Sequence, residues 1–213
     1  AWTYDLEGRL TGVPMRKDYP ALDMAASGLA PVELENWQGF LFVRLADDGG
    51  PGVATMMAPF EAEIAPYRFR DLTPLGRVTL RPRAINWKNI GDNYSDGFHI
   101  PVAHPGLKRL MGDGYGVAAS EHVDKMWGPI LAGPSSNPSE AAYQALLPHV
   151  DHLPADRQRL WTYFKLWPNV AIDIYPDQID FMQWLPVSPT ESLIREIAYV
   201  IPDERRSMRA ARY

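Results

Sequence analysis

The sequence lacks cysteine, an excess of basic residues and any long apolar run. None of its 213 residues is Cys, which excludes disulfides, a cysteine nucleophile and thiolate-bound metal within the chain. The formal net charge is -5, and Lys and Arg are scattered, so nucleic acid and anionic membrane surfaces are poor candidate partners. No apolar run reaches the roughly 18 residues that a membrane span needs. We therefore expect a cytoplasmic globular protein that binds neither nucleic acid nor membrane.

Both ends of the sequence fall inside predicted elements. Trp2–Leu6 and Leu10–Val13 are strand-like runs on either side of a turn at Glu7-Gly8, a pattern that predicts a hairpin. Near the other end, Pro202 and Asp203 are typical of a helix start. We expect the chain to be a fragment that is cut close to both elements.

Between its ends the sequence predicts an α+β fold, an antiparallel sheet with helices packed on one face. The run NWQGFLFVRL leads into turn-forming residues at 46–52, which divide a small leading β unit, residues 1–47, from residues 48–213. Four apolar runs bounded by Pro, Asn or Ser-Pro-Thr predict a meander over 159–168, 170–176, 178–187 and 192–202. The other predicted elements are helices over 60–67, 86–98 and from about 140, and a strand over 76–85.

The stretch GDNYSDGFHIPVAH, residues 91–104, combines several metal-competent side chains. His99 and His104 are five residues apart, about 140° beyond one full turn of an ideal helix, so a continuous helix would not point both rings at one ion. Pro101 disfavours helix before it, so we expect the helix to end near His99 and a bend to bring His104 back. Two neutral imidazoles suit Fe, Zn, Cu or Ni, and with one carboxylate they form the facial arrangement of oxygen-activating ferrous sites.

The surrounding residues resemble the iron-binding helix of the α subunit of Rieske non-haem iron oxygenases, the ring-hydroxylating oxygenase family. The family pattern is Asn-Trp-Lys, an acidic residue followed by Asn, an acidic residue three before the first His, and a second His five further on. The matching residues are Asn86-Trp87-Lys88, Asp92-Asn93, Asp96, His99 and His104. AWTYDLEGRLTGVP and WQGFLFVRL are similar to the end of the family's Rieske domain, and LWPNVAIDIYPDQIDFMQWLPVSPTES is similar to its central sheet. The resemblance covers essentially the whole chain.

This resemblance implies a mononuclear Fe(II) held by His99, His104 and a carboxylate. Asp96 would hydrogen-bond a ligating His and link it to the 2Fe–2S Rieske cluster of the neighbouring subunit; being three residues before His99, it is also placed to fix that ring. Asn93, one turn earlier, is the second candidate catalytic residue, with a hydrogen bond near the iron. The third ligand, an acidic residue, is expected beyond residue 213, and the cluster ligands are absent from the sequence.

The implied protein is the terminal component of an oxygenase. Residues 1–47 would be the end of a Rieske domain and residues 48–213 a helix-grip-like catalytic domain. The enzyme would take electrons from NAD(P)H through a reductase or ferredoxin, use O2 in a mono- or dioxygenase reaction, and hydroxylate an aromatic or other apolar small molecule. Relatives also suggest a homo-oligomer, a trimer or hexamer.

The substrate pocket has two candidate linings. Inward-facing strand residues would serve an apolar substrate; they are Phe164, Ile172, Phe181 and Met182. Aromatic residues would instead form a cage for a quaternary ammonium compound, since cations bind well on aromatic faces; they are Tyr163, Trp167, Tyr175 and Trp184. The acids of the same strands are expected in solvent-facing or turn positions; they are Asp173, Asp177 and Asp180.

Two other classes of function stay open. A sheet wrapped round a helix can carry an apolar ligand without catalysis, with the two His as core polar groups. A hydrolytic zinc site is a third possibility, although no acid is placed convincingly as its general base. His122, His149 and His152 lie in polar or loop-rich surroundings, where we expect helix-end or surface roles.

Overall fold

The computed structural model describes residues 1–45 and 49–202. The chain divides into two compact units, Ala1–Val53 and the residues from Ala54 onward. The helix predicted after Pro202 lies outside the described residues. In the part that the structure describes, no helix is both long enough and apolar enough to span a membrane.

The first unit contains two antiparallel hairpins. Strands β1 (Thr3–Tyr4) and β2 (Leu10–Gly12) form the first, as the sequence predicts. The second joins β3 (Glu33–Trp37) to β4 (Phe40–Arg44). Its turn residues Gln38 and Gly39 have φ of 52° and 93°, the left-handed pair that matches the twist of a two-residue hairpin. A short 3-10 helix, η1 (Arg16–Asp18), lies between the hairpins in the sequence.

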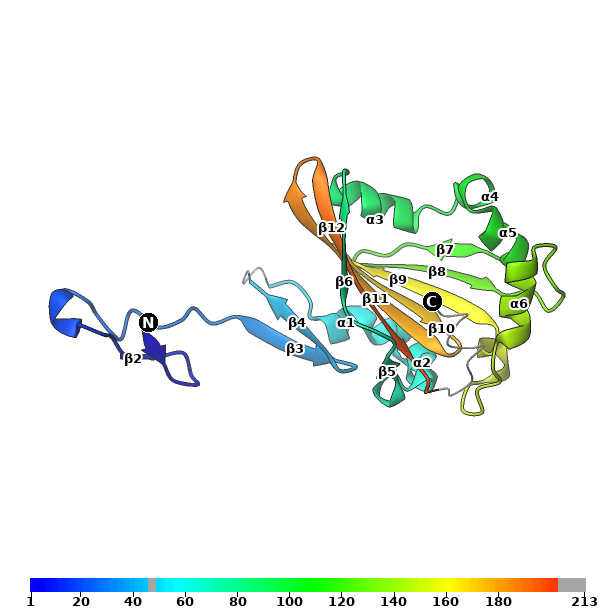
Figure 1. The fold of residues 1–213 in the computed structure, drawn as a ribbon. Coiled ribbons are helices and arrows are strands. Elements are labelled where there is room, and N and C mark those ends of the chain that lie inside the picture. The colour runs from blue at the N-terminus through cyan, green and yellow to red at the C-terminus, as the bar shows by residue number, and fades with distance from the viewer. Residues whose placement is uncertain (46–48, 203–213) are drawn as a thin grey trace. The chain divides into compact units, whose positions relative to one another are not determined.

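The second unit is built on an eight-stranded antiparallel sheet with the order β5-β12-β11-β10-β9-β8-β7, in which β6 also pairs with β12. Its strands are β5 (Thr73–Pro74), β6 (Thr79–Arg83), β7 (Gly116–Ala118), β8 (Val123–Pro129), β9 (Leu160–Leu166), β10 (Val170–Tyr175), β11 (Gln178–Ser188) and β12 (Glu191–Val200). The predicted meander is therefore confirmed as β9 to β12. Figure 1 shows its strands side by side.

The register divides the side chains of the sheet between two faces. Residues opposite one another on neighbouring strands share a face, and one such row runs through Met126, Tyr163, Asp173 and Asp180. We call this side the polar face. The next row, through Phe164, Ile172 and Phe181, belongs to the opposite side, which we call the apolar face.

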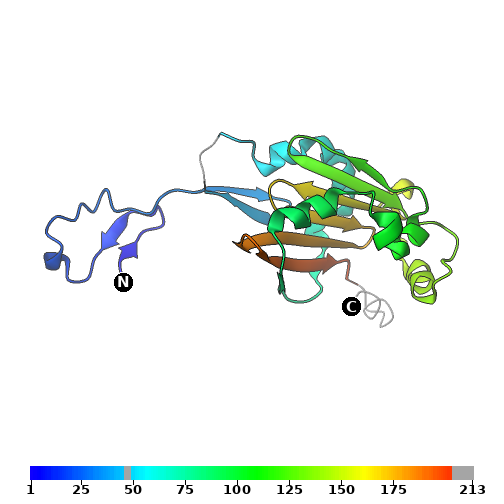
Figure 2. The same cartoon turned by 90° about the horizontal axis from the view of Figure 1, so that it is seen from above.

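Helices cover both faces of the sheet. The helices α3 (Trp87–Ser95), α4 (Ile100–Ala103) and α5 (Pro105–Met111) follow one another along the polar-face side, and Figure 2 shows the same arrangement from above. Helix α6 (Pro138–Leu146) has Asn137 as its N-cap and begins two residues before the predicted start near Glu140.

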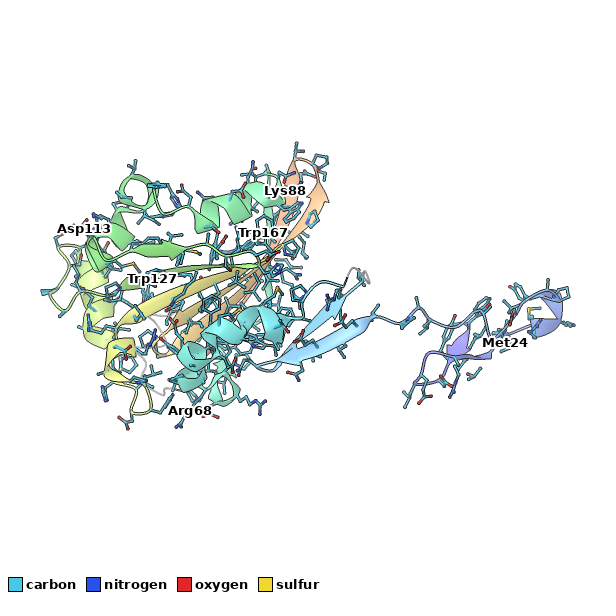
Figure 3. The ribbon with its side chains drawn as sticks, turned by 180° about the vertical axis from the view of Figure 1, so that it is seen from behind. Met24, Arg68, Lys88, Asp113, Trp127 and Trp167 are labelled. Carbon is cyan, nitrogen blue, oxygen red and sulfur yellow. The ribbon has the colours of Figure 1, made fainter. Side chains whose placement is uncertain are left out.

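Short helices lie on the apolar-face side. They are α1 (Val53–Met57), η2 (Ala58–Phe60), α2 (Glu61–Ile64), η3 (Ala65–Tyr67) and η4 (Phe69–Asp71). The ring of Phe60 packs against Phe164, with centroids 5.0 Å apart, and Lys125 Nζ donates to Glu63 Oε2 at 2.5 Å. Figure 3 labels Lys88 on α3 and Arg68 in this second group, on opposite sides of the sheet. The α+β class with an antiparallel sheet is confirmed, and the structure adds this second layer of helices to the expected one. A further 3-10 turn, η5 (Ala155–Arg157), precedes β9.

Truncation of Phe164 tests the packing of the apolar face. Phe164 is 0% exposed, whereas Phe98 is 95% exposed, so the two offer the same substitution in opposite environments. We expect Phe164→Ala to lower the free energy of unfolding by about 3–5 kcal/mol, because it leaves a cavity. Phe98→Ala should change it by less than about 0.5 kcal/mol. Urea unfolding measures both, and equal losses would contradict the described packing.

Candidate metal centre

Helix α3 is fixed to the polar face by one side of its last two turns. Gly91, Tyr94 and Ser95 are spaced as neighbours on a helix face, and each contacts the sheet. A Cβ added to Gly91 would lie 3.3 Å from Trp184 Nε1, so glycine allows this close approach. The Tyr94 hydroxyl donates to Asp173, and Ser95 Oγ donates to Asp124 Oδ2 at 2.8 Å. The opposite side of the helix, with Asp92 and Asn93, is exposed.

Asp96 forms the C-cap of α3 and turns the chain toward His99. Its φ of -74° and ψ of 119° are extended, so the helix ends at Ser95 and not near Phe98 as expected. Asp96 Oδ1 accepts from the Phe98 backbone N–H at 2.9 Å, and Oδ2 lies 3.3 Å from His99 Nδ1. The hydrogen bond from the Phe98 backbone N–H lowers the pKa of Asp96, and the hydrogen bond with the His99 ring lowers it further. An ionised Asp96 therefore accepts a hydrogen bond from the Nδ1–H of His99, which leaves Nε2 for another partner.

The two histidines stand at opposite ends of the one-turn helix α4. His99 is its N-cap and His104 its C-cap, and their ring centroids are 4.9 Å apart with the planes at 68°. Two imidazoles on adjacent positions of one ion have ring centres roughly 4.5–5 Å apart, since each nitrogen lies about 2.1 Å from the ion. The spacing and chemistry of this pair therefore fit a shared metal ion.

The bend that brings the rings together has a different cause from the one expected. Pro101 lies within the first turn of α4, where proline is tolerated because its missing N–H has no helical partner. The chain leaves the helix at His104, whose φ is -124° and ψ 63°, directly before Pro105. Proline disfavours helical backbone in the residue before it, so Pro105 turns His104 back.

The described residues supply two candidate histidine ligands and no complete metal site. Among residues 1–45 and 49–202 there is no cluster of three His, Cys, Asp or Glu side chains that could hold an ion. Asn93, predicted to bond near the metal, is on the exposed side of α3. The side chain of His149 is 75% exposed, beside Asp151, in the surface role that was expected.

Two acids of the last strands are buried, Asp173 at 7% and Asp177 at 5% exposure. The prediction of solvent-facing or turn positions is wrong for Asp173, which lies within β10, whereas Asp177 does lie in the turn between β10 and β11. Strand alternation explains Asp173, because position 173 shares the face that α3 covers. Its carboxylate accepts from the hydroxyls of Tyr94 and Tyr175. Burial nevertheless raises the pKa of Asp173 to about 7, and that of the opposite Asp180 to about 6.

Aromatic rings gather beside these acids. The rings of Trp161, Tyr163 and Tyr175 meet edge to face, with centroids 4.9 Å apart for Trp161 and Tyr175 and 6.2 Å for Tyr163 and Tyr175. Tyr115 lies 6.5 Å from Tyr163. Burial raises the pKa of Tyr115 to about 12, with further contributions from Asp173 and Asp96. Tyr115 is therefore close to both the acid group and the carboxylate that holds His99.

The candidate pocket residues divide between the two faces. Of the proposed aromatic cage, Tyr163 and Tyr175 belong to the group just described, whereas Trp184 is buried under α3 and Trp167 is half exposed at the end of β9. Of the proposed apolar lining, Met182 is on the polar face, and Phe164, Ile172 and Phe181 are on the other. Trp161 and Tyr115 were not named as pocket residues from the sequence. Trp161 could have been found, because it is two residues from Tyr163 on the same strand and therefore shares its face.

Comparison with known proteins gives one family. The family described as "Ring hydroxylating alpha subunit (catalytic domain)" matches residues 69–213. The glycine betaine monooxygenase oxygenase subunit of Chromohalobacter salexigens is 36% identical over 108 residues, which are 50% of this chain and 23% of the relative. The carnitine monooxygenase oxygenase subunit of Escherichia coli K12 is 27% identical over 183 residues, 83% of this chain and 44% of the relative.

A solved structure is similar in fold along nearly the whole chain. A quaternary ammonium Rieske monooxygenase in complex with an inhibitor has a TM-score of 0.73 and 19% identity, covering 99% of this chain and 54% of that one. At this identity the likeness concerns the fold alone. The chain spans less than half the length of the two curated relatives.

The buried Asp173 makes the stability depend on pH. Its pKa is about 7 in the folded protein and near 3.9 in an unfolded chain. Between these values the folded state binds more protons, so the free energy of unfolding falls as the pH rises from about 4 to about 7, by at most roughly 1.4 kcal/mol per unit of pKa difference. Asp173→Asn cannot ionise, and we expect a shallower decline in urea unfolding measured across this range.

Asp113→Asn is the control for this slope. Lys108 lowers the pKa of the Asp113 carboxylate, so Asp113 contributes stability that is present above its unfolded pKa and is lost as the pH falls. Its replacement can only leave the decline unchanged or make it steeper. If the free energy of unfolding of Asp173→Asn declined with pH as steeply as that of the parent protein, Asp173 would not be buried as described.

Proposed function

The chain belongs to the family of ring-hydroxylating oxygenase α subunits, and on this basis we propose that it carries the iron-binding helix of a Rieske non-haem iron oxygenase with a cationic substrate. The observation that supports the proposal best is the pairing of His99 and His104, with ring centroids 4.9 Å apart. The pair lies in a chain whose family match begins at residue 69 and includes both residues.

The mononuclear iron would be held by His99 and His104 with an acidic ligand from outside the described residues. Two imidazoles and a carboxylate leave open positions on a ferrous ion, and this iron supplies the oxygen chemistry when it is bound. Asp96 accepts a hydrogen bond from the Nδ1–H of His99, which fixes the ring for coordination through Nε2. Asp96 is also the residue proposed to link this centre to the Rieske cluster of a neighbouring subunit.

The proposed electron path requires partners. The family uses non-haem iron and a Rieske cluster, receives electrons from a reductase or ferredoxin, and assembles into oligomers. We propose a trimer or hexamer of the whole protein, because the path from cluster to iron crosses between subunits. The hairpins of the first unit would then be the end of the Rieske domain, followed by the catalytic domain.

A cationic substrate is favoured over an arene by the two acids within the polar face. Asp173 and Asp180 are directly opposite on β10 and β11, and in the described part of the chain no Lys, Arg or His contributes to the pKa of either. The faces of tyrosine and tryptophan rings attract cations, and these rings lie next to the acids. Two relatives are named for glycine betaine and carnitine, which are both quaternary ammonium compounds.

Removal of either histidine tests the iron site. We expect His99→Ala and His104→Ala each to weaken Fe(II) binding by at least about 100-fold. Loss of a residue that only hydrogen-bonds a ligand lowers metal affinity about 10- to 100-fold, and loss of the ligand itself should cost at least as much. Anaerobic titration with Fe(II), on the chain and on the whole oxygenase component, gives the dissociation constants. His149→Ala is the control, because this side chain is exposed and lies beside Asp151.

The outcomes separate the three classes of function. Fe(II) binding that depends on both histidines, with consumption of O2 and reductant by the whole component, supports the oxygenase. If the whole component without substitutions binds no Fe(II), the oxygenase proposal is overturned and the carrier of an apolar ligand remains. Metal-dependent ester or amide cleavage without O2 would identify a hydrolytic zinc site instead.

The substrate class is tested with two compounds that differ in charge alone. Glycine betaine and 3,3-dimethylbutanoate have the same shape, and only the first has a quaternary nitrogen. We expect the whole component to bind glycine betaine more tightly, and Tyr163→Leu to reduce this preference by about 2- to 30-fold, the value of one cation–π contact. Tyr199→Leu, on the apolar face, should leave the preference unchanged.

Equilibrium binding of both compounds, with naphthalene as a third, is the measurement. Equal affinity for glycine betaine and 3,3-dimethylbutanoate would contradict the cationic substrate. Selective binding of naphthalene would support an arene oxygenase of the same family.

A further inference from the structure

A buried pair of opposite charges lies beneath the end of α3. Lys165 on β9 and Asp124 on β8 are directly opposite on the polar face, and Lys165 Nζ lies 2.9 Å from Asp124 Oδ2. These residues are 2% and 8% exposed. Removing two charges from water is costly, and a well-packed apolar pair at the same place is often as stable or more stable. Stability alone therefore does not account for the pair.

Both charged residues also hold the last turn of α3. Asp124 Oδ2 accepts from Ser95 Oγ at 2.8 Å, and Lys165 Nζ donates to the Gly91 carbonyl oxygen at 3.3 Å. A positive charge is favourable at this end of a helix, where the carbonyl groups carry partial negative charge. Two neighbouring strands are thus tied to the end of the helix, β8 at Ser95, the residue that precedes Asp96, and β9 at Gly91.

We propose that Ser95, Asp124 and Lys165, here called the clamp, are positioning residues for the metal centre. Ser95 is the last residue of α3. The next residue is Asp96, whose carboxylate accepts the hydrogen bond from the His99 ring. The strands give the clamp a rigid base, whereas Asp96 itself has extended backbone between two helices. The clamp therefore sets the place of Asp96 and, through it, the orientation of the His99 ring.

This inference rests on the proposed function, because it takes His99 as an iron ligand. None of the three clamp residues touches the iron or the substrate in the proposal. The clamp acts on the metal only through Asp96 and His99. Its loss should therefore change metal affinity and coordination geometry more than it changes folding.

Ser95→Ala is the mildest test. It removes one hydroxyl, keeps the ion pair and introduces a residue that favours helix. We expect the dissociation constant of Fe(II) to rise about threefold to tenfold, at or below the lower end of the range for outer partners of a ligand. We also expect the visible absorption spectrum of the Co(II)-loaded protein to change, because this spectrum reports coordination geometry. The urea midpoint should remain close to that of the parent.

The double variant Asp124→Leu/Lys165→Met removes the charges together. We expect it to unfold at the same or a higher urea concentration than the parent, while Fe(II) binds about tenfold or more weakly. The matched control is Lys125→Met, which removes the ion pair with Glu63 on the apolar face from the same strand as Asp124. This control should leave Fe(II) affinity and the Co(II) spectrum unchanged.

The results distinguish this inference from the function on which it rests. If the parent binds no Fe(II), or if His99→Ala binds it as the parent does, the proposed function fails. If binding depends on His99 but Ser95→Ala keeps the parental affinity and Co(II) spectrum, the clamp has no positioning role. A double variant that does not fold would overturn the expectation that the ion pair is unnecessary for stability, and Ser95→Ala still decides the positioning role.

Discussion

The docking of α3 on the polar face of the sheet is the constraint on which the candidate centre depends. Gly91 permits close approach to Trp184, and the hydroxyls of Tyr94 and Ser95 bond to acids on two different strands. These contacts fix the end of the helix, so the residues that follow start from a defined point. Asp96 then caps the helix, and one turn of α4 places His99 and His104 side by side.

The polar face combines this geometry with an unusual burial of charge. Asp124 has a cationic partner in Lys165, whereas Asp173 and Asp180 are approached by hydroxyl and amide donors. Their raised pKa values show that burial outweighs these hydrogen bonds. Under the proposed function, a bound cation would supply the missing compensation, and helix docking and substrate binding would share one side of the sheet.

The sequence predicted the elements and the histidine pair better than the surroundings of the pair. Period-two apolar runs and proline breaks indicated β9 to β12, and Asn86 and Asn137 were recognisable as helix starts. From the sequence, the bend was attributed to Pro101 because one helix was expected to run on to about His99. In the structure α3 ends at Ser95 and a new helix, α4, begins at Ile100, so Pro101 lies in a first turn where proline is tolerated. Asp173 was misplaced because alternation gives two faces but does not say that both are covered. The clamp joins residues up to 74 apart in sequence, and local patterns carry no such information.

The location of iron in the assembled protein tests the central claim most directly. Crystals of the whole protein grown anaerobically with Fe(II) would give an anomalous signal at the iron absorption edge. Apart from the irons of the Rieske cluster, the account predicts one peak about 2.1 Å from His99 Nε2 and from one ring nitrogen of His104, with Asp96 at His99 Nδ1. A mononuclear iron bound to other residues, or to only one of the two histidines, would contradict it.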